Sequence, residues 1–133
     1  MTEKFELYKC SICGNLVEVM LTGAGELVCC GQKMELLKIQ NAQNDEQLTE
    51  KHSPVIWHNN GISEIRTGPH PMIPEHYIMF TECFSEDKNE AQIKYFYPND
   101  NPIMQTNIKD KHLSAISYCN IHGLYDDTKK KEE

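Results

Sequence analysis

The chain has 133 residues, of which 39% are hydrophobic and 25% charged, and its formal net charge at pH 7 is −7. This length predicts one ordinary domain or a small domain joined to a larger one, and the acidic balance argues against nucleic acid, which binds basic surfaces. No apolar run approaches the length of a membrane span and the N-terminus has no signal-peptide pattern, so we expect a cytoplasmic protein that contacts no membrane.

The first forty residues are expected to form a small unit of short strands and tight turns. Residues 17–21 alternate partly between apolar and polar, Gly23-Ala24-Gly25 predicts a turn, and Leu27-Val28 leads into a pair of cysteines. A segment of this size buries little core, and units below about 40 residues usually need a metal or disulfides. The polar residues 41–49 are predicted to be a linker.

Four cysteines in this first unit indicate a metal site. Cys10 and Cys13 form a Cys-x-x-Cys turn, which aims two sulfurs at one point, and Cys29 and Cys30 are adjacent. Neighbouring Cα atoms lie about 3.8 Å apart, which is below the usual disulfide range of roughly 4.4–6.8 Å. A four-sulfur site holds zinc or iron. The adjacent pair is unusual for a zinc ribbon, but sulfur count alone does not decide the metal.

Residues 50–126 are predicted to form an antiparallel sandwich or barrel. We find no long amphipathic helix in this part of the chain, and the segments between the strands carry Gly, Pro, Asn and Asp turn signals. The predicted strands are Pro54–Trp57, Ile62–Arg66, Tyr77–Phe84, Gln92–Tyr97 and Leu113–Tyr118. The end of the chain, residues 127–133, is charged and is predicted to be a tail.

A second group of metal-binding side chains is spread over the sandwich sequence. The group is His52, His70, His76, Cys119 and His122. One thiolate with several imidazoles suits a redox metal better than a structural zinc, and four imidazoles in a plane with one axial thiolate leave a sixth position open. Any single histidine is more often a surface or hydrogen-bonded residue than a ligand. His58, which is predicted to lie in a turn, and His112 are accordingly assigned no ligand role. Cys83 lies within an apolar strand and is expected to be a small core residue.

Taken together, the order and spacing of these motifs resemble those of the desulfoferrodoxin family, the two-iron form of superoxide reductase. The matching segments span nearly the whole chain: Tyr8-Lys9-Cys10, Cys13-Gly14-Asn15, Cys29-Cys30-Gly31, Glu50-Lys51-His52, His70-Pro71-Met72, Glu75-His76 and Cys119-Asn120-Ile121-His122-Gly123. The resemblance implies an all-β fold: a desulforedoxin-like metal domain over residues 1–40, then an immunoglobulin-like antiparallel β-sandwich over residues 50–126.

The resemblance also implies two iron ions per chain and a reaction. Cys10, Cys13, Cys29 and Cys30 would bind the first iron; His52, His70, His76 and His122 would bind the catalytic iron equatorially, with Cys119 axial. Glu50 would close the sixth position of the ferric iron, and Lys51 would be the cation beside the superoxide site. Superoxide would be reduced to hydrogen peroxide, with a rubredoxin-like electron donor and a homodimeric assembly.

Two other functions are compatible with the motifs. One is a non-catalytic electron-transfer protein that uses only the four-cysteine iron, and the other is a structural zinc protein with a β-sandwich binding module. The two-iron enzyme predicts two irons per chain with distinct thiolate-to-iron absorption bands, whereas the zinc protein would be colourless. The physiological donor is not indicated by the sequence, nor is a relay role for the first iron.

Overall fold

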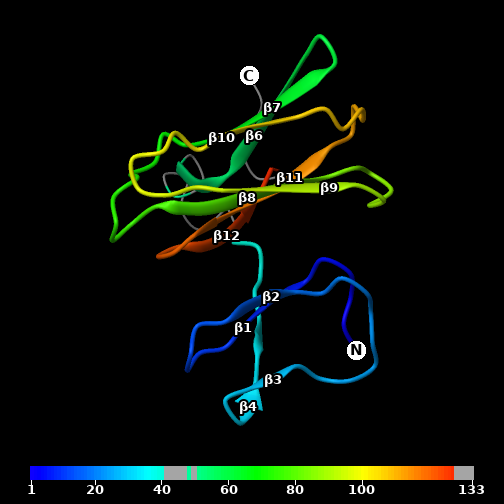
Figure 1. Ribbon diagram of the computed structural model, residues 1–133, viewed down its shortest axis with the longest axis vertical. Helices are drawn as coiled ribbons and strands as arrows, with labels where there is room; N and C mark the ends of the chain where they lie inside the picture. The colour runs from blue at the N-terminus through cyan, green and yellow to red at the C-terminus, as the bar shows by residue number, and fades with distance from the viewer. Residues whose placement is uncertain (41–47, 49–50, 128–133) are drawn as a thin grey trace. The chain divides into compact units, whose positions relative to one another are not determined.

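The computed structural model describes residues 1–40, 48 and 51–127, so the predicted linker at 41–49 lies outside the described residues except for Leu48. The chain divides into two compact units, Met1–Lys38 and Ile39–Glu133. Both are built from β-strands (Figure 1). Among the described residues, no helix is long and apolar enough to cross a membrane.

The first unit consists of five very short strands and has almost no core. The strands are β1 (Leu7–Lys9), β2 (Leu16–Glu18), β3 (Val28–Cys29), β4 (Gln32–Lys33) and β5 (Glu35–Leu36), in the orders β2-β1-β5 and β3-β4. Within Met1–Lys38 the buried residues are Thr2, Leu7, Cys10 and Val19. Because so little apolar surface is removed from water, packing alone contributes little to the stability of this unit.

The second unit is a sandwich of two antiparallel sheets, which Figure 1 shows as two layers. One sheet has the order β10-β7-β6 and the other β12-β11-β8-β9. The strands are β6 (Pro54–Asn59), β7 (Ile62–Thr67), β8 (Ile78–Phe84), β9 (Ala91–Tyr95), β10 (Ile103–Thr106), β11 (Ser114–Cys119) and β12 (Gly123–Asp126). The all-β fold class predicted from the sequence is therefore confirmed.

Alternating inward side chains from both sheets build one core. Ile65 and Met104 come from the first sheet, and Ile78, Cys83 and Ala115 from the second. Cys83 is fully buried in this cluster, as expected for a small core residue. Cys119 belongs to the same cluster, so the metal-binding side chains of this unit begin at the edge of the core.

The end of the sandwich that carries Cys119 has an irregular register. Tyr118 pairs with Phe80 and Cys119 pairs with Ile78, so β8 has one extra residue at this point. Such bulges twist a strand locally and re-aim side chains next to functional sites. The bulge therefore lies where β11 turns its last residue, Cys119, toward the histidines.

Two strands and the start of the tail differ from the sequence-based expectation. β10 and β12 were not predicted, since each has only four residues and neither shows a strong apolar alternation. Asp127, which we assigned to the tail, is held by the sheet: its N–H donates to the Ala115 carbonyl, and its carboxylate accepts from the Ala115 N–H. The rest of the predicted tail, residues 128–133, lies outside the described residues.

Candidate metal centres

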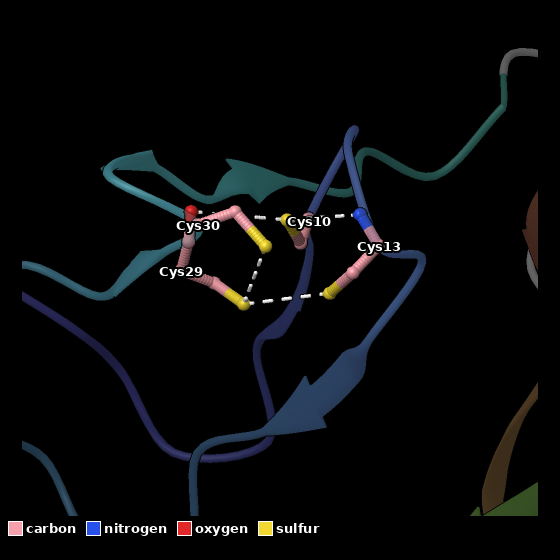
Figure 2. Close-up of side chains that lie close together, drawn as sticks. All are labelled: Cys10, Cys13, Cys29 and Cys30. Atoms are coloured by element: carbon pink, nitrogen blue, oxygen red, sulfur yellow. Dashed lines mark hydrogen bonds between the residues drawn. The ribbon is translucent and has the colours of Figure 1, made fainter.

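The four cysteines of the first unit converge from two turns (Figure 2). Cys10 and Cys13 lie between β1 and β2, while Cys29 ends β3 and Cys30 follows it. The Sγ atoms of Cys13 and Cys29 are 3.5 Å apart, and those of Cys29 and Cys30 are 3.9 Å apart. Four sulfurs about 2.3 Å from a tetrahedral metal would be separated by about 3.8 Å. The spacing therefore fits one tetrahedral metal ion.

The backbone of both turns is shaped for this convergence. Gly14 and Gly31 have φ angles of 83° and 76°, a region that glycine enters at no steric cost, and Cys30 has a φ of 52°. The left-handed conformation of Cys30 is what lets two adjacent cysteines point to the same centre, as Figure 2 shows. None of the six cysteines forms a disulfide.

The protonation behaviour of these thiols also suits a cation. The backbone N–H of Cys13 donates to the Sγ of Cys10 at 3.4 Å, which lowers the pKa of Cys10 to about 6. Hydrogen bonds with Cys13 and Cys10 raise the pKa of Cys30 to about 12. The Cys10 thiolate therefore forms readily, whereas Cys30 holds its proton until a metal ion replaces it.

In the second unit, five potential ligands meet at one end of the sandwich. His52 lies in a helical turn before β6, His70 and His76 lie between β7 and β8, Cys119 ends β11, and His122 lies in the turn before β12. One donor atom each of His52, His70, His76 and Cys119 lies within 4.8 Å of the others. The Nδ1 of His122 joins them, 3.1 Å from the Nε2 of His52 and 3.9 Å from the Cys119 sulfur.

The hydrogen bonds of the imidazoles show which nitrogens are available. The Nδ1 of His52 is 2.6 Å from the Leu48 carbonyl, and the Nδ1 of His70 is 2.5 Å from the Pro71 carbonyl. A carbonyl only accepts hydrogen bonds, so in both rings Nδ1 carries the proton and Nε2 presents a lone pair. Orientation of a ligating histidine by such a partner is typical of metal sites.

The Nε2 lone pairs of His52 and His70 face each other at the centre of this group. The Nε2 atoms of His52 and His70 are 2.9 Å apart, and the Cys119 sulfur is 3.5 Å from the Nε2 of His70. The Nε2 of His76 is buried without a hydrogen-bond partner. Two nitrogens bound at right angles to a metal at about 2.1 Å would lie about 3.0 Å apart. A metal ion at the centre would satisfy all these groups at once.

Burial keeps the imidazoles in the neutral form that binds metals. Desolvation lowers the pKa of both His52 and His70 to about 4, and it also lowers the pKa of His76. The positive charge of Lys51 adds to the lowering at His70 and His76, so this exposed ammonium acts on the site through its field. Burial raises the pKa of Cys119, while N–H groups of His122 and Ile121 oppose that shift.

All the cysteine and histidine ligands predicted from the sequence lie in one of these two clusters. The structure brings together the four cysteines of the first group and the four histidines and one cysteine of the second. Lys51 acts on two of these histidines, and Glu50 lies outside the described residues. His58 is on a strand, not in a turn as expected, and its Nδ1 is 2.8 Å from the Ser63 hydroxyl.

Four residues around the second site were not singled out from the sequence. The Leu48 carbonyl orients His52, the Ser117 hydroxyl donates to the His52 carbonyl at 2.5 Å, and the Tyr125 ring stacks on the His52 ring. The side chain of Asn120 accepts from the Tyr77 N–H and donates to the Glu75 carbonyl. Asn120 lies inside the recognised motif; the other three carry no local signal, because their roles depend on long-range contacts.

The chemistry of the two donor sets fits two iron ions per chain. Four thiolates at tetrahedral spacing suit iron or zinc. Four imidazoles with one thiolate are a mixed set that suits a redox-active metal, and a set of five leaves one position of an octahedron for another ligand. The four thiolates would fill every coordination position of their metal, whereas the set of four imidazoles and one thiolate would leave one position for a small molecule.

Comparison with known proteins supports both halves of this description. Residues 2–37 match the desulfoferrodoxin N-terminal domain model, and residues 44–128 match the desulfoferrodoxin model. A desulfoferrodoxin homolog of Archaeoglobus fulgidus is 39% identical over 127 residues, 94% of this chain and 98% of the relative.

Two proteins named superoxide reductase are also similar to this chain. That of Pyrococcus abyssi is 33% identical over 96 residues, covering 58% of this chain and 84% of the relative. The crystal structure of the superoxide reductase from Treponema pallidum has the same fold, with a TM-score of 0.69 at 21% identity, covering 95% of this chain and 98% of that one.

Proposed function

The chain belongs to the desulfoferrodoxin family, and on that premise we propose that it is a superoxide reductase. The reaction is the reduction of one superoxide anion by one electron and two protons to hydrogen peroxide. The iron for this reaction would be held by His52, His70, His76, His122 and Cys119. The observation that carries the proposal is the convergence of the donor atoms of four imidazoles and one buried thiol, with the His76 Nε2 buried and without a hydrogen-bond partner.

The iron would supply the one-electron exchange with superoxide. The protein's own part begins with the tautomers of His52 and His70, which the Leu48 and Pro71 carbonyls hold so that Nε2 faces the site. The Cys119 sulfur is shielded from solvent and receives the backbone N–H of His122 at 3.4 Å, a contact that stabilises the thiolate form. A thiolate ligand raises the electron density at the metal.

Lys51 is proposed to attract the substrate. Superoxide is an anion and the chain has a net charge of −7, so the overall field opposes its approach. The ammonium of Lys51 already acts on His70 and His76, which supports a local positive field at the site. Glu50 would be a further ligand of that iron in its oxidised form.

The wider assignments are also part of the proposal. A rubredoxin-like protein supplies the electrons, the protein is a cytoplasmic homodimer, and its domains are 1–40 and 50–126 with a linker between them. The homodimer is supported by a groove of ≈ 580 Å³ in the first unit, whose lining includes the exposed apolar side chains of Leu21 and Val28. A unit with so small a core gains much from covering such a groove.

Metal analysis with a visible spectrum and a superoxide assay tests the proposed reaction. We expect two irons per chain, two thiolate-to-iron bands, and a fast second-order reaction of the reduced protein with superoxide. Cys119→Ser should abolish one band and slow that reaction by at least about a hundredfold, since a directly bound ligand matters more than the 10–100-fold typical of its hydrogen-bond partners. Cys83→Ser, at a buried cysteine outside both sites, is the matched control.

The same measurements separate the alternatives. One iron per chain, with Cys119→Ser unchanged in superoxide reactivity, would indicate an electron-transfer protein that uses the four-cysteine site alone. A colourless chain containing zinc would indicate a structural protein. Either result would refute the proposed reductase.

A further inference from the structure

His52 is the most deeply buried imidazole of the second site. Its ring centroid lies 4.5 Å from that of His70, 4.7 Å from that of His122 and 6.2 Å from that of His76. It is fully buried, whereas the other three histidines keep some contact with solvent. Any rotation of the His52 ring therefore moves its Nε2 relative to two neighbouring nitrogens at once.

Besides its contacts with the other histidines, His52 is held by three residues, and they restrain different motions. The Ser117 hydroxyl donates to the His52 carbonyl and so anchors the main chain. The Leu48 carbonyl accepts from Nδ1 and fixes one direction in the ring plane. A single hydrogen bond leaves the ring free to tilt about that direction, because a carbonyl accepts over a broad range of angles. Something else must set the tilt.

The Tyr125 ring provides that restraint. It lies parallel to the His52 ring, with centroids 4.7 Å apart and an interplanar angle of 18°. Tyr125 is itself 3% exposed, so its ring has little room to move away. Stacked aromatic rings prefer such offset parallel arrangements, and this contact covers one face of the imidazole.

Strand pairing places Tyr125 opposite Ser117, the residue that anchors the main chain of His52. Tyr125 on β12 is the paired residue of Ser117 on β11, and directly paired residues point to the same face of a sheet. The far edge of β12 is covered by the chain that enters this unit: the Gln40 N–H donates to the Leu124 carbonyl at 2.8 Å, and Ile39 forms a parallel bridge with Leu124. One pair of facing side chains thus holds both the main chain and the ring of His52.

We propose that Tyr125 is a positioning residue for the second metal centre: its ring sets the plane of the His52 imidazole and thereby aims the Nε2 lone pair at the metal. The inference rests on the proposed function, since it takes His52 as an iron ligand. The phenol group is not required for this role; the flat ring is. Tyr125 consequently controls how tightly the iron is held and at what potential it is reduced.

The test compares three variants of the full iron-loaded chain. Tyr125→Leu removes the ring, Tyr125→Phe keeps it without the hydroxyl, and Phe84→Leu removes a buried aromatic ring from the other end of β8. Iron loss to an excess of chelator is followed at the Cys119 thiolate-to-iron band, and the midpoint potential of that iron is measured alongside. We expect Tyr125→Leu to lose iron about tenfold faster and to shift the potential. Tyr125→Phe and Phe84→Leu both leave an aromatic ring stacked on His52. Their rates of iron loss should therefore stay within about twofold of the wild-type rate.

Two results would overturn the inference. Equal iron loss and potential in Tyr125→Leu and Phe84→Leu would show that the ring only contributes to packing. Equal defects in Tyr125→Leu and Tyr125→Phe would assign the effect to the hydroxyl. A wild-type chain without iron at this site would refute the proposed function itself, an outcome visible before any variant is compared.

Discussion

The two metal-binding sites of this chain are built on opposite principles. The four cysteines lie on turns of a unit with four buried residues, and two of them, Cys13 and Cys30, are exposed. The four histidines and Cys119 lie at the end of a sandwich with a continuous core, and His52 and Cys119 are fully buried. In the first unit the metal takes the place of a core; in the second the core exists first and presents ligands to the metal.

The two sites therefore differ in how metal binding relates to folding of the surrounding unit. In the first unit we expect metal binding to be coupled to folding, as it is in zinc fingers. In the second, the fold already brings imidazole nitrogens within 2.9–3.1 Å of each other, close to the spacing at which they would bind one metal ion. We therefore expect a structural role for the first metal and a reactive role for the second. Four variants or conditions test this contrast, from the largest expected effect to the smallest.

The largest effect is expected from loss of a first-site ligand. Cys13→Ser should unfold Met1–Lys38 while leaving the sandwich folded, because structural metals supply about 10–16 kcal/mol in zinc-finger peptides and this unit has little else. Hydrogen exchange resolved by residue would show loss of protection in β1 to β5 and none in the strands of the sandwich. Ile12→Ser, between the two cysteines and 62% exposed, is the control. Retained hydrogen-exchange protection of β1 to β5 in Cys13→Ser would show that the first unit does not depend on its metal for folding.

The next largest effect is expected from the side chain of Asn120, which is hydrogen-bonded to the loop that carries His76. Asn120→Ala removes two hydrogen bonds, to the Tyr77 N–H and the Glu75 carbonyl, on either side of His76. At about 0.5–1.5 kcal/mol each, their loss should lower the free energy of unfolding of the sandwich by about 1–3 kcal/mol. Denaturant titration of the iron-free protein measures it, with the exposed Asn101→Ala as control. Equal midpoints for both variants would remove Asn120 from this role.

Lys51 should affect rate without affecting the fold. Lys51→Ala should slow the second-order reaction with superoxide about tenfold at low salt, and Lys51→Arg should retain most of the rate, since electrostatic steering commonly contributes 10–10³-fold. The difference between the two variants should shrink as salt is added, because screening acts beyond about 8–10 Å. Stopped-flow or pulse radiolysis at several ionic strengths gives the rate constants. A Lys51→Ala rate equal to that of wild type at low salt would exclude the role.

The smallest effect is a pH dependence of the iron-free sandwich. The pKa values of His52 and His70 are lowered to about 4 in the folded chain from an ordinary value of 6.5. Unfolding therefore takes up protons as pH falls below 6.5, and the stability these neutral imidazoles maintain is progressively lost until pH reaches about 4. Denaturant midpoints between pH 7 and pH 4 should fall less steeply in His70→Gln than in wild type. Identical slopes, with the exposed His112→Gln as reference, would contradict the shifts.

Several parts of this structure could be predicted from local sequence. β6, β7, β8, β9 and β11 were each predicted to within about two residues, because turn residues bound apolar stretches there. β10 and β12 were missed, since Gly123–Asp126 becomes a strand only by pairing with β11 across a tight turn. The Cys-x-x-Cys turn and the Cys119–His122 spacing were equally local, because both place two ligands within one turn of chain.

The sequence by itself determined the donor types, their order, and the division into a cysteine-rich unit and a strand-rich one. These follow from composition and from the spacing of residues that are close together in the sequence, and neither depends on tertiary contacts. Only the tertiary structure decided how His52 meets ligands 18 to 70 residues away, and which groups hold it there. Ser117 and Tyr125 act through sheet register, and Asn120 through a contact with a distant loop. Such relations arise when the core closes, so no local pattern of residues could have indicated them.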